Sequence, residues 1–222
     1  MTVMRLKDAR QSRIRTTNSG IILDAALEVF SAYGFRGSTV DQIAASANMS
    51  KPNLLYYFRR KEDIYVALLE RTLADWLEPL KRLKPEGEPL AEIAAYVSAK
   101  LKMSRDNPKA SRLFANELLH GAPAISSFLS GPLKTLVDDK ARVIAGWVRQ
   151  GRIANVDPYH LIFSLWAMTQ TYADFDVQIR AIIGDDQKRF ADAEKAILTI
   201  VLNGLKPRNS VIPAKAGTHP ST

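Results

Sequence analysis

Hydrophobic residues recur every three to four positions along most of the chain, which is the spacing of one face of an α-helix. The first clear run contains Ile22, Ala26, Phe30 and Tyr33. Glycine and proline residues interrupt the runs. No stretch shows the sustained apolar–polar alternation that is typical of a half-buried strand. The pattern therefore predicts an all-α fold.

Capping and helix-breaking residues delimit the expected helices. Gly34 ends the first run, Thr39 or Ser38 caps the second, and Ser50 caps the third. Pro79 is expected to kink the long fourth helix or to end it early. The expected helices cover about 18–33, 39–46, 50–58, 61–83, 89–105, 109–119, 132–150, 158–174, 175–183 and 187–204.

These helices suggest two domains between two irregular ends. Residues 18–60 predict a small N-terminal domain of three helices, and residues 61–206 predict a larger helical domain. The helix that begins the second domain would span about 35 Å, which is long enough to join the two. Residues 1–17 are polar and basic, so a disordered arm is expected there. Residues 207–222 contain three prolines and no helical period, so a disordered tail is expected.

Positive charge is concentrated near the N-terminus. The whole chain has a formal net charge of +8; residues 1–61 contain ten Lys/Arg and four acidic residues, which leaves +6 of the +8 in that quarter. A basic segment joined to a nearly neutral remainder is typical of a module that binds a polyanion such as nucleic acid. A solvated basic tail is the alternative, because five of these ten cations precede residue 16.

Several classes of protein are disfavoured by what the sequence lacks. The chain has no cysteine and only three histidines, which excludes disulfides and cysteine zinc sites and offers no metal cluster. No nucleotide-binding or hydrolase motif is found, so an enzyme is not expected. No segment has the roughly 20 apolar residues that a bilayer requires, and no signal peptide is recognisable. We expect a cytoplasmic protein without a membrane partner; a helical protein-interaction module is a rival that would bind DNA poorly.

The basic region contains two short helices joined by a tight turn, the pattern of a helix-turn-helix. Ser50 begins the second of these helices, whose first N–H groups can face phosphate. Lys51 and Asn53 lie in its first turn, where side chains reach base edges. An ordinary corner between two helices would share this pattern. The motif alone therefore leaves DNA binding open.

The residues of this motif resemble the DNA-binding region of TetR-type regulators. The segment is STVDQIAASANMSKPNLLYYFRRKEDIYVALL, residues 38–69, and it meets the family pattern at Thr39, Ile43, Ala44, Ala47, Ser50, Tyr57, Phe58, Lys61 and Glu62. Further segments resemble a pyrimidine-responsive branch of that family, at 75–80, 107–123, 143–153 and 157–175. The resemblance covers about 21–206. It implies a helix-turn-helix DNA-binding domain followed by a helical ligand-binding and dimerisation domain.

The resemblance also implies which residues meet DNA. Thr39 would hold a phosphate, and Tyr57 and Lys61 would touch backbone phosphates, which position a protein without reading sequence. Tyr56 is an exposed aromatic candidate, with simple packing as its alternative role. The complete implied set is Thr39, Ser50, Lys51, Asn53, Tyr56, Tyr57 and Lys61.

Two arginines depart from the family pattern. Arg59 and Arg60 stand where the family usually has proline and then serine. The change gives up a good helix cap and adds two positive charges beside the DNA backbone. We expect stronger, more salt-dependent and less selective binding.

The expected helix 158–174 has polar and aromatic residues suited to a planar ligand. Helical spacing places Phe163, Trp166, Gln170 and Asp174 near one face. A carboxamide has a donor beside an acceptor, which matches the imide edge of uracil or thymine, and an indole offers a flat wall. From spacing alone, the tryptophan is more typical of a core and the glutamine of a surface.

The resemblance favours the ligand role. It implies that Trp166 and Gln170 bind a pyrimidine and that Trp76 lines the pocket. The full candidate set is Trp76, Trp166, Gln170, Phe114, Met103, Tyr172 and Asp174, of which Phe114, Met103 and Tyr172 could equally be core residues. No cofactor is expected besides this small-molecule effector. The alternative is a TetR-type repressor that responds to another planar or apolar ligand.

The end of the chain has an apolar stripe that fits a dimer. It consists of Ala193, Ile197, Ile200, Val201 and Leu205. The resemblance implies a homodimer built on a four-helix bundle, which would place two recognition helices about 34–36 Å apart on a palindromic operator. Burial of the stripe within the monomer is the alternative. In the dimer, bound effector would bias the helix at 61–83 and release the DNA.

Overall fold

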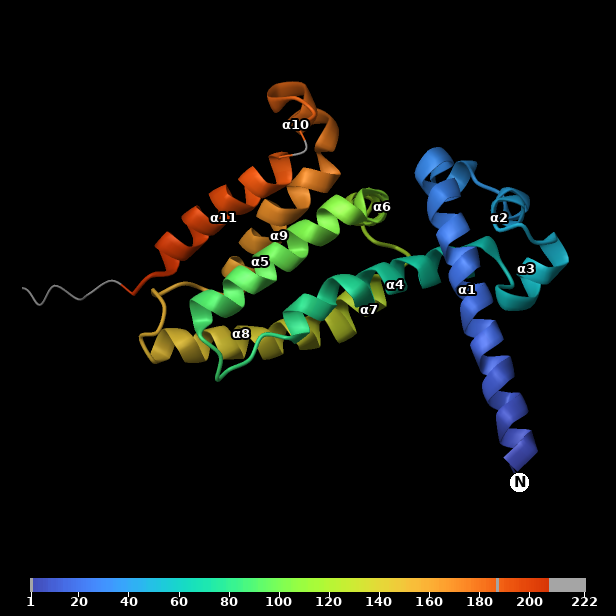
Figure 1. Ribbon diagram of the computed structural model, residues 1–222, viewed down its shortest axis with the longest axis horizontal. Coiled ribbons are helices and arrows are strands. Elements are labelled where there is room, and N and C mark those ends of the chain that lie inside the picture. The colour runs from blue at the N-terminus through green and yellow to red at the C-terminus, as the bar shows by residue number, and fades with distance from the viewer. Residues whose placement is uncertain (1, 187, 208–222) are drawn as a thin grey trace, which may run out of the picture.

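The structure is a computed structural model that describes residues 2–186 and 188–207, with side chains from residue 13 onward. Apart from residue 207, the expected disordered tail lies outside the described residues. In the described ranges the secondary structure is helical and contains no strand, which confirms the all-α prediction. Figure 1 shows a small N-terminal head, formed by α1–α3, joined through α4 to a larger helical body.

The helices follow the expected order closely. Their bounds are α1 (Thr2–Gly37), α2 (Val40–Ser46), α3 (Lys51–Tyr57), α4 (Lys61–Lys81), α5 (Pro89–Asp106), α6 (Pro108–Leu119), α7 (Ser126–Phe128), the π-helical turn η1 (Leu129–Leu133), α8 (Lys134–Arg149), α9 (Pro158–Asp174), α10 (Asp176–Ile183) and α11 (Arg189–Leu205). Pro79 lies two residues before the end of α4, so this helix ends early, as expected.

The N-terminus differs from the expectation of a disordered arm. Residues 2–17 are helical and continuous with the packed part of α1, so that prediction is wrong for them. The chain contains no glycine or proline before Gly20, and the segment has four arginines together with one Met, Leu, Lys, Ala and Gln, all of which are good helix formers. Adding residues to an existing helix avoids the cost of nucleation. Low hydrophobicity therefore did not indicate disorder here.

Gly34 breaks α1 where the sequence predicts. Its backbone has φ 68° and ψ 170°, a conformation that glycine adopts without the steric cost of a side chain. Beyond it the chain turns toward α2. The Ser38 hydroxyl donates to the Gly34 carbonyl at 2.6 Å and stabilises this turn.

A second difference lies before α8. The sequence predicts a break at Gly131 and Pro132, but α7 and η1 lead continuously into α8. A π-helical turn is wider than an α-helical turn, and proline has no N–H to contribute to a regular helix. The wider turn therefore accommodates Pro132 without ending the helical path.

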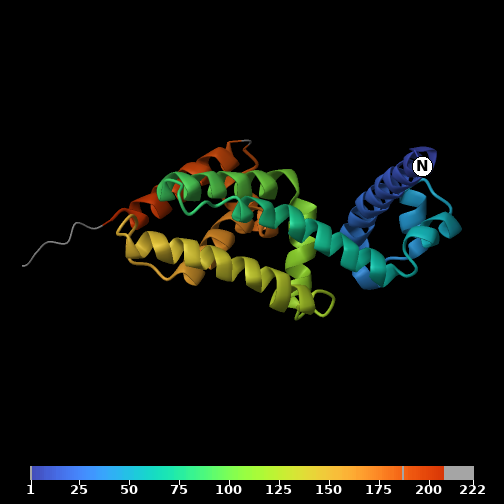
Figure 2. The same cartoon turned by 90° about the horizontal axis from the view of Figure 1, so that it is seen from below.

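Two apolar clusters hold the molecule together, and their border does not follow the expected domain boundary. The first contains residues of α1–α3 with Ile64–Trp76 of α4, and also Leu113 and Phe114 of α6. The second begins at Leu80 of α4 and extends through α5, α8, α9 and α11. The division expected between residues 60 and 61 thus differs from the change of packing, which lies inside α4. Figure 2 shows α4 running from the head into the body.

No helix in the part of the chain that the structure describes is long and apolar enough to cross a membrane.

Candidate DNA-binding and effector sites

The helix-turn-helix is formed by α2 and α3. The Thr39 hydroxyl accepts from the backbone N–H of Gln42 at 3.2 Å, and the Gln42 side chain accepts from the backbone N–H of Thr39 at 2.8 Å, which completes a capping box. The Ser50 hydroxyl accepts from the backbone N–H of Asn53 at 3.3 Å. Asn48 adopts φ 54° in the turn, a conformation that asparagine tolerates better than most residues. Both caps that the sequence predicts are therefore present.

The candidate base-reading residues lie on the surface of α3. Lys51 and Asn53 are exposed in its first turn, and Tyr56 is 69% exposed. Leu54, between them, is completely buried and fixes the helix in the head. The Lys51 ammonium forms an ion pair with Asp41 at 2.9 Å. Lys51 must leave this partner to reach a base.

Tyr57 and Lys61 have structural contacts that the sequence did not reveal. The Asn18 side-chain amide donates to the Tyr57 hydroxyl at 2.6 Å. The Lys61 ammonium donates to the carbonyls of Phe35 and Ser38, both at 2.7 Å, and lies 4.5 Å from the centre of the Phe35 ring. Lys61 therefore joins α4 to the end of α1. The phosphate contacts expected of Tyr57 and Lys61 stay predictions.

The two unusual arginines differ in their surroundings. Arg60 occupies the N-cap of α4, and its side chain cannot accept a hydrogen bond. Asp63 partly replaces the missing cap, because its carboxylate accepts from the Arg60 backbone and from the Arg60 guanidinium, both at 3.1 Å. Arg59 is exposed. The pair thus adds one partly neutralised charge and one exposed charge.

The candidate effector residues begin with Trp76, which is 6% exposed. Its ring packs edge to face against the ring of Phe114, with ring centres 5.5 Å apart. The Lys100 ammonium lies 4.5 Å from the centre of the same indole. Met103 is half-buried and packs against the first apolar cluster, to which Trp76 and Phe114 belong. Two predicted pocket residues, Trp76 and Phe114, are therefore in contact, and a buried cation lies beside them.

Lys100 is the functional candidate that the sequence did not reveal. It is 3% exposed, and burial lowers the pKa of its ammonium to about 8, although the nearby Asp174 acts in the opposite direction. Burial also raises the pKa of Asp174, against the hydrogen bond from Ser111 and the charges of Lys100 and Arg112. A lysine seven residues after the buried Ile93 of α5 was the available signal, since this spacing returns to the same helix face.

Trp166 and Gln170 lie about two turns and one turn of α9 before Asp174. The Trp166 indole N–H donates to the Tyr96 hydroxyl at 2.6 Å. Gln170 is half-buried, and its side chain makes no hydrogen bond to any residue that the structure describes. Because α9 residues four apart share a face, Gln170 lies between Trp166 and Asp174. Tyr172 instead packs against Phe190 of α11, with ring centres 6.2 Å apart.

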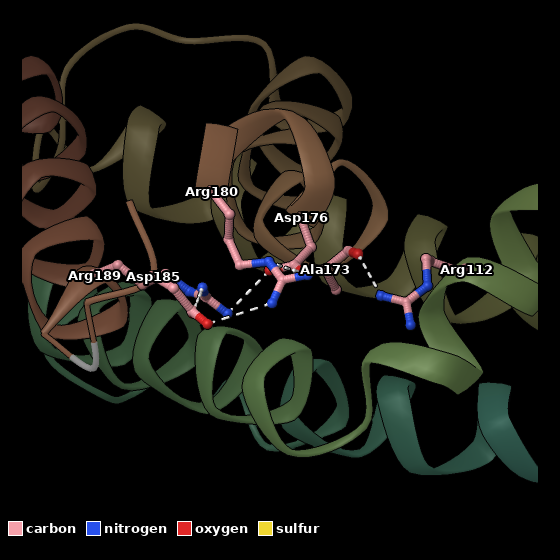
Figure 3. Close-up of polar contacts among 6 residues, drawn as sticks. All are labelled: Arg112, Ala173, Asp176, Arg180, Asp185 and Arg189. Carbon is pink, nitrogen blue, oxygen red and sulfur yellow. Dashed lines mark hydrogen bonds and ion pairs between the residues drawn. The ribbon is translucent and has the colours of Figure 1, made fainter. Parts of the chain in front are cut away.

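Helix α6 connects these effector candidates to the head. At one end, Ser111 donates to Asp174. The neighbouring Arg112 donates to the carbonyl of Ala173 at 3.2 Å, as Figure 3 shows. At the other end, the buried Glu117 accepts from the Tyr65 hydroxyl at 3.0 Å. Lys109 also forms an ion pair with Glu28 of α1. One helix therefore contacts both the effector candidates and the packed helices of the head.

Ion pairs fix the chain just after the effector candidates. Asp176 binds Arg180 at 3.2 Å and Arg189 at 2.9 Å, and Asp185 binds Arg189 at 2.6 Å (Figure 3). These pairs hold α10 against the start of α11. They constrain the end of α9, where Asp174 lies.

A large hollow lies elsewhere. It is a groove of about 1000 Å³ between the C-terminal half of α1 and α6, and its lining includes Tyr33, Tyr65 and Glu117. None of the predicted effector residues lines it. Among the described residues, no group of three or more histidine or acidic side chains is suited to a metal ion.

The apolar stripe on α11 is mostly buried within the monomer. Ala193, Ile197, Val201 and Leu205 are each 3–7% exposed and belong to the second cluster. The prediction that these four residues form dimer contacts is therefore wrong. They are buried within the monomer, which was the alternative. Ile200 is 62% exposed. Exposed apolar residues also occur on α9, on α10 and between them: Phe163, Phe175, Val177, Ile182 and Ile183.

Comparisons with known proteins agree with this geometry. Residues 22–68 match the family described as bacterial regulatory proteins, tetR family, and residues 69–208 match the C-terminal region of YcdC-like proteins. The chain is 46% identical over 202 residues to the HTH-type transcriptional regulator RutR of Escherichia coli K12, covering 90% of this chain and 95% of that protein. It is 33% identical over 81 residues to the repressor NicS of Pseudomonas putida, covering 34% of this chain and 38% of NicS.

Solved structures share the fold. A fatty acid metabolism regulator of Clostridium perfringens superposes with a TM-score of 0.66 at 23% identity, covering 83% of this chain and 97% of that chain. AibR, in complex with isovaleryl coenzyme A and operator DNA, superposes with a TM-score of 0.65 at 20% identity, covering 82% and 97%. At these identities the likeness shows the fold alone. It confirms the arrangement of a helix-turn-helix head on a helical body.

Proposed function

Because the chain belongs to the TetR family of bacterial regulatory proteins, we propose that it binds a palindromic operator as a homodimer and releases it when uracil or thymine binds near Trp76, Trp166 and Gln170. The proposal starts from what the family membership establishes. The chain is a ligand-responsive transcriptional regulator of the TetR type, homologous to RutR, and not an enzyme.

One observation carries the pyrimidine assignment. Gln170 shares a face of α9 with Trp166 and Asp174. No described residue forms a hydrogen bond with its carboxamide. A carboxamide that offers a donor beside an acceptor complements an imide, which offers an N–H beside a carbonyl. Indole rings supply apolar faces for a planar base.

The Lys100–Asp174 pair extends this complementarity. The Lys100 ammonium is a donor for a ring carbonyl, and the Asp174 carboxylate is an acceptor for a ring N–H. A base with two carbonyl groups and two N–H groups can use both this pair and Gln170. An ordinary hydrocarbon ligand would leave these polar groups without partners, which is costly in a buried site.

The response to the ligand follows from the contacts of α6. A base whose N–H donates to Asp174 competes with the Ser111 hydroxyl for that carboxylate, and a shift of α6 would be transmitted to Tyr65 of α4 through Glu117. Movement of α4 changes the angle of the head. The separation of the two recognition helices in the dimer then no longer fits the operator. For this to release DNA, the ligand must bind the DNA-incompetent state more tightly.

The first test is a thermal melt of the purified protein with uracil, thymine, cytosine or no base. A ligand that binds only the folded protein raises its melting temperature. We expect a rise with uracil and thymine and none with cytosine, which lacks the imide edge. Operator DNA should then dissociate on addition of the same two bases. A rise with cytosine alone, or with none of the three, would refute the pyrimidine assignment.

A further inference from the structure

The first half of α1 extends beyond the packed head. Residues 2–17, named here the basic extension, form a continuous helix with the packed residues that follow. At 1.5 Å per residue the extension is about 24 Å long. Figures 1 and 2 show it running past α3, with its N-terminal end away from the body.

The composition of the basic extension does not suit packing against protein. Its five cations are Arg5, Lys7, Arg10, Arg13 and Arg15, against the single acidic residue Asp8, so its net charge is 5 − 1 = +4. Arg13 and Arg15 are exposed, and Ile14 between them is 51% exposed. Successive residues turn by about 100° around a helix, so the five basic positions are distributed around the helix axis. A helix with this distribution of positive charge attracts a polyanion from any side.

The start of this extension is fixed beside the recognition helix. Asn18 donates to the hydroxyl of Tyr57 in the last turn of α3 at 2.6 Å. Two residues further along, the Gly20 carbonyl accepts from Arg71 at 3.4 Å, and Arg71 also pairs with Asp24 at 2.8 Å. The extension therefore leaves the head next to the surface that carries the candidate DNA-binding residues.

From this placement we infer that the basic extension is a second DNA-binding element, which contacts phosphates of the duplex beyond the base pairs read by α3. The inference rests on the proposed DNA-binding function and adds a surface to it. Contacts to phosphates depend on charge and not on base sequence. The extension would therefore lengthen the bound segment and increase the salt dependence of binding without changing which bases are preferred.

The test compares two triple variants of the full chain. In the first, Arg10→Gln, Arg13→Gln and Arg15→Gln remove three charges from the extension. In the second, Lys81→Gln, Arg82→Gln and Lys84→Gln remove three charges from exposed positions at and just beyond the far end of α4. The DNA is the site that the unchanged chain recovers from a random duplex library. It is used once with about ten extra base pairs on each side and once trimmed to the base pairs that α3 requires.

We expect the extension variant to bind the long duplex at least about tenfold more weakly. The slope of log K against log salt should become shallower by about 0.9 for each phosphate that the variant no longer neutralises. On the trimmed duplex the same variant should match the unchanged chain, and the Lys81/Arg82/Lys84 control should match it on both. The melting temperature of the extension variant should be unchanged, because these residues lie outside the two apolar clusters.

Unchanged binding to the long duplex would overturn the inference, and so would equal weakening on both lengths. The DNA-binding function itself is tested separately. Lys51→Ala with Asn53→Ala should abolish sequence preference on both duplexes. If the unchanged chain recovers no site from the library, both the function and the inference fail; if it recovers a site but the extension variant binds normally, only the inference fails.

Discussion

In the head, the side chains that would meet DNA come from one short segment, residues 39–61; most are exposed, and Tyr57 and Lys61 are half-buried. In the effector region the candidate side chains are buried or half-buried and come from four helices, between Trp76 and Asp174. The first site is a surface supported by a local motif, and the second is an interior assembled from distant parts. This difference decides how each site tolerates change and how visible it is in the sequence.

The charges of the two regions illustrate the contrast. Lys51 pairs with Asp41 in water, where such an ion pair contributes at most about 1 kcal/mol. Lys100 and Asp174 are removed from water, and the cost of burying charges can exceed their attraction. Buried ionisable groups of this kind are often kept for function. Burial of these two charges thus lowers the stability of the effector region, whereas the exposed Lys51–Asp41 pair has no such cost in the head.

The largest effect should come from the apolar support of each region. Ile43→Ala removes a fully buried side chain of α2, and Ile162→Ala removes an equally buried one of α9. Each should lower the free energy of unfolding by about 2–5 kcal/mol, measured by denaturant titration. Only Ile43→Ala should also abolish operator binding. Loss of operator binding in both variants would mean that the two regions are not separable in this way.

The next effect concerns the response to the base. Gln170→Leu should weaken uracil binding at least about tenfold, because the imide then faces an apolar side chain, while operator affinity without ligand stays the same. Gln178→Leu, at an exposed position of α10, is the matched control and should respond normally. Calorimetry with uracil measures the affinities. Equal affinity in the two variants would show that Gln170 does not contact the base.

A pH series tests whether Lys100 is as buried as the structure indicates. Its pKa is about 8 in the folded protein and about 10.4 in an unfolded chain. Between these two pH values the unfolded chain binds more protons than the folded protein, so the free energy of unfolding rises with pH. Below about pH 8 the destabilisation caused by burying the charged ammonium is constant.

Relative to the Lys100→Met variant, the free energy of unfolding of the unchanged protein should therefore rise by roughly 1 kcal/mol per pH unit between pH 8 and 10. Tyr65 and Tyr96, whose pKa values are raised mainly by burial, are present in both proteins and cancel in the difference. Denaturant titrations at each pH give the two curves. Parallel curves would mean that Lys100 is solvated in the folded protein.

A smaller effect is expected from the unusual arginines. Arg59→Pro with Arg60→Ser restores the family pattern and removes two charges. The slope of log K against log salt should become shallower by about 0.9 per phosphate set free, and the change should be larger on random DNA than on operator. Because Asp63 already pairs with Arg60, most of the change should come from Arg59. Identical slopes for the variant and the unchanged protein would contradict the expectation.

The smallest effect should be at Asp41. Asp41→Asn frees Lys51 from its ion pair and should strengthen operator binding by less than about 1 kcal/mol, because exposed pairs contribute little. Fluorescence anisotropy at low and high salt measures it. A gain of several kcal/mol would mean that the pair holds Lys51 away from DNA much more firmly than an exposed ion pair can.

The sequence predicted the head better than the effector region for physical reasons. Caps such as Thr39 and Ser50 act within three residues of themselves, so their neighbours in sequence reveal them. Lys100 meets Trp76 and Asp174 only because α4, α5 and α9 pack together, and no local pattern encodes that packing. The helical extension was missed because a low content of apolar residues was interpreted as disorder, although its residues favour helix.

The border of the two apolar clusters has a consequence for building chimeric regulators. The loop before α4 resembles a natural place to exchange one head for another. A cut there would, however, separate Ile64, Leu68 and Leu69 from the helices that cover them, since all three belong to the cluster of the head. A junction between Trp76 and Leu80 transfers the α4 residues of this cluster together with the head. The residues of α6 that pack against them must then be transferred as well. In this fold the exchangeable unit is therefore a core, and not a segment of the chain.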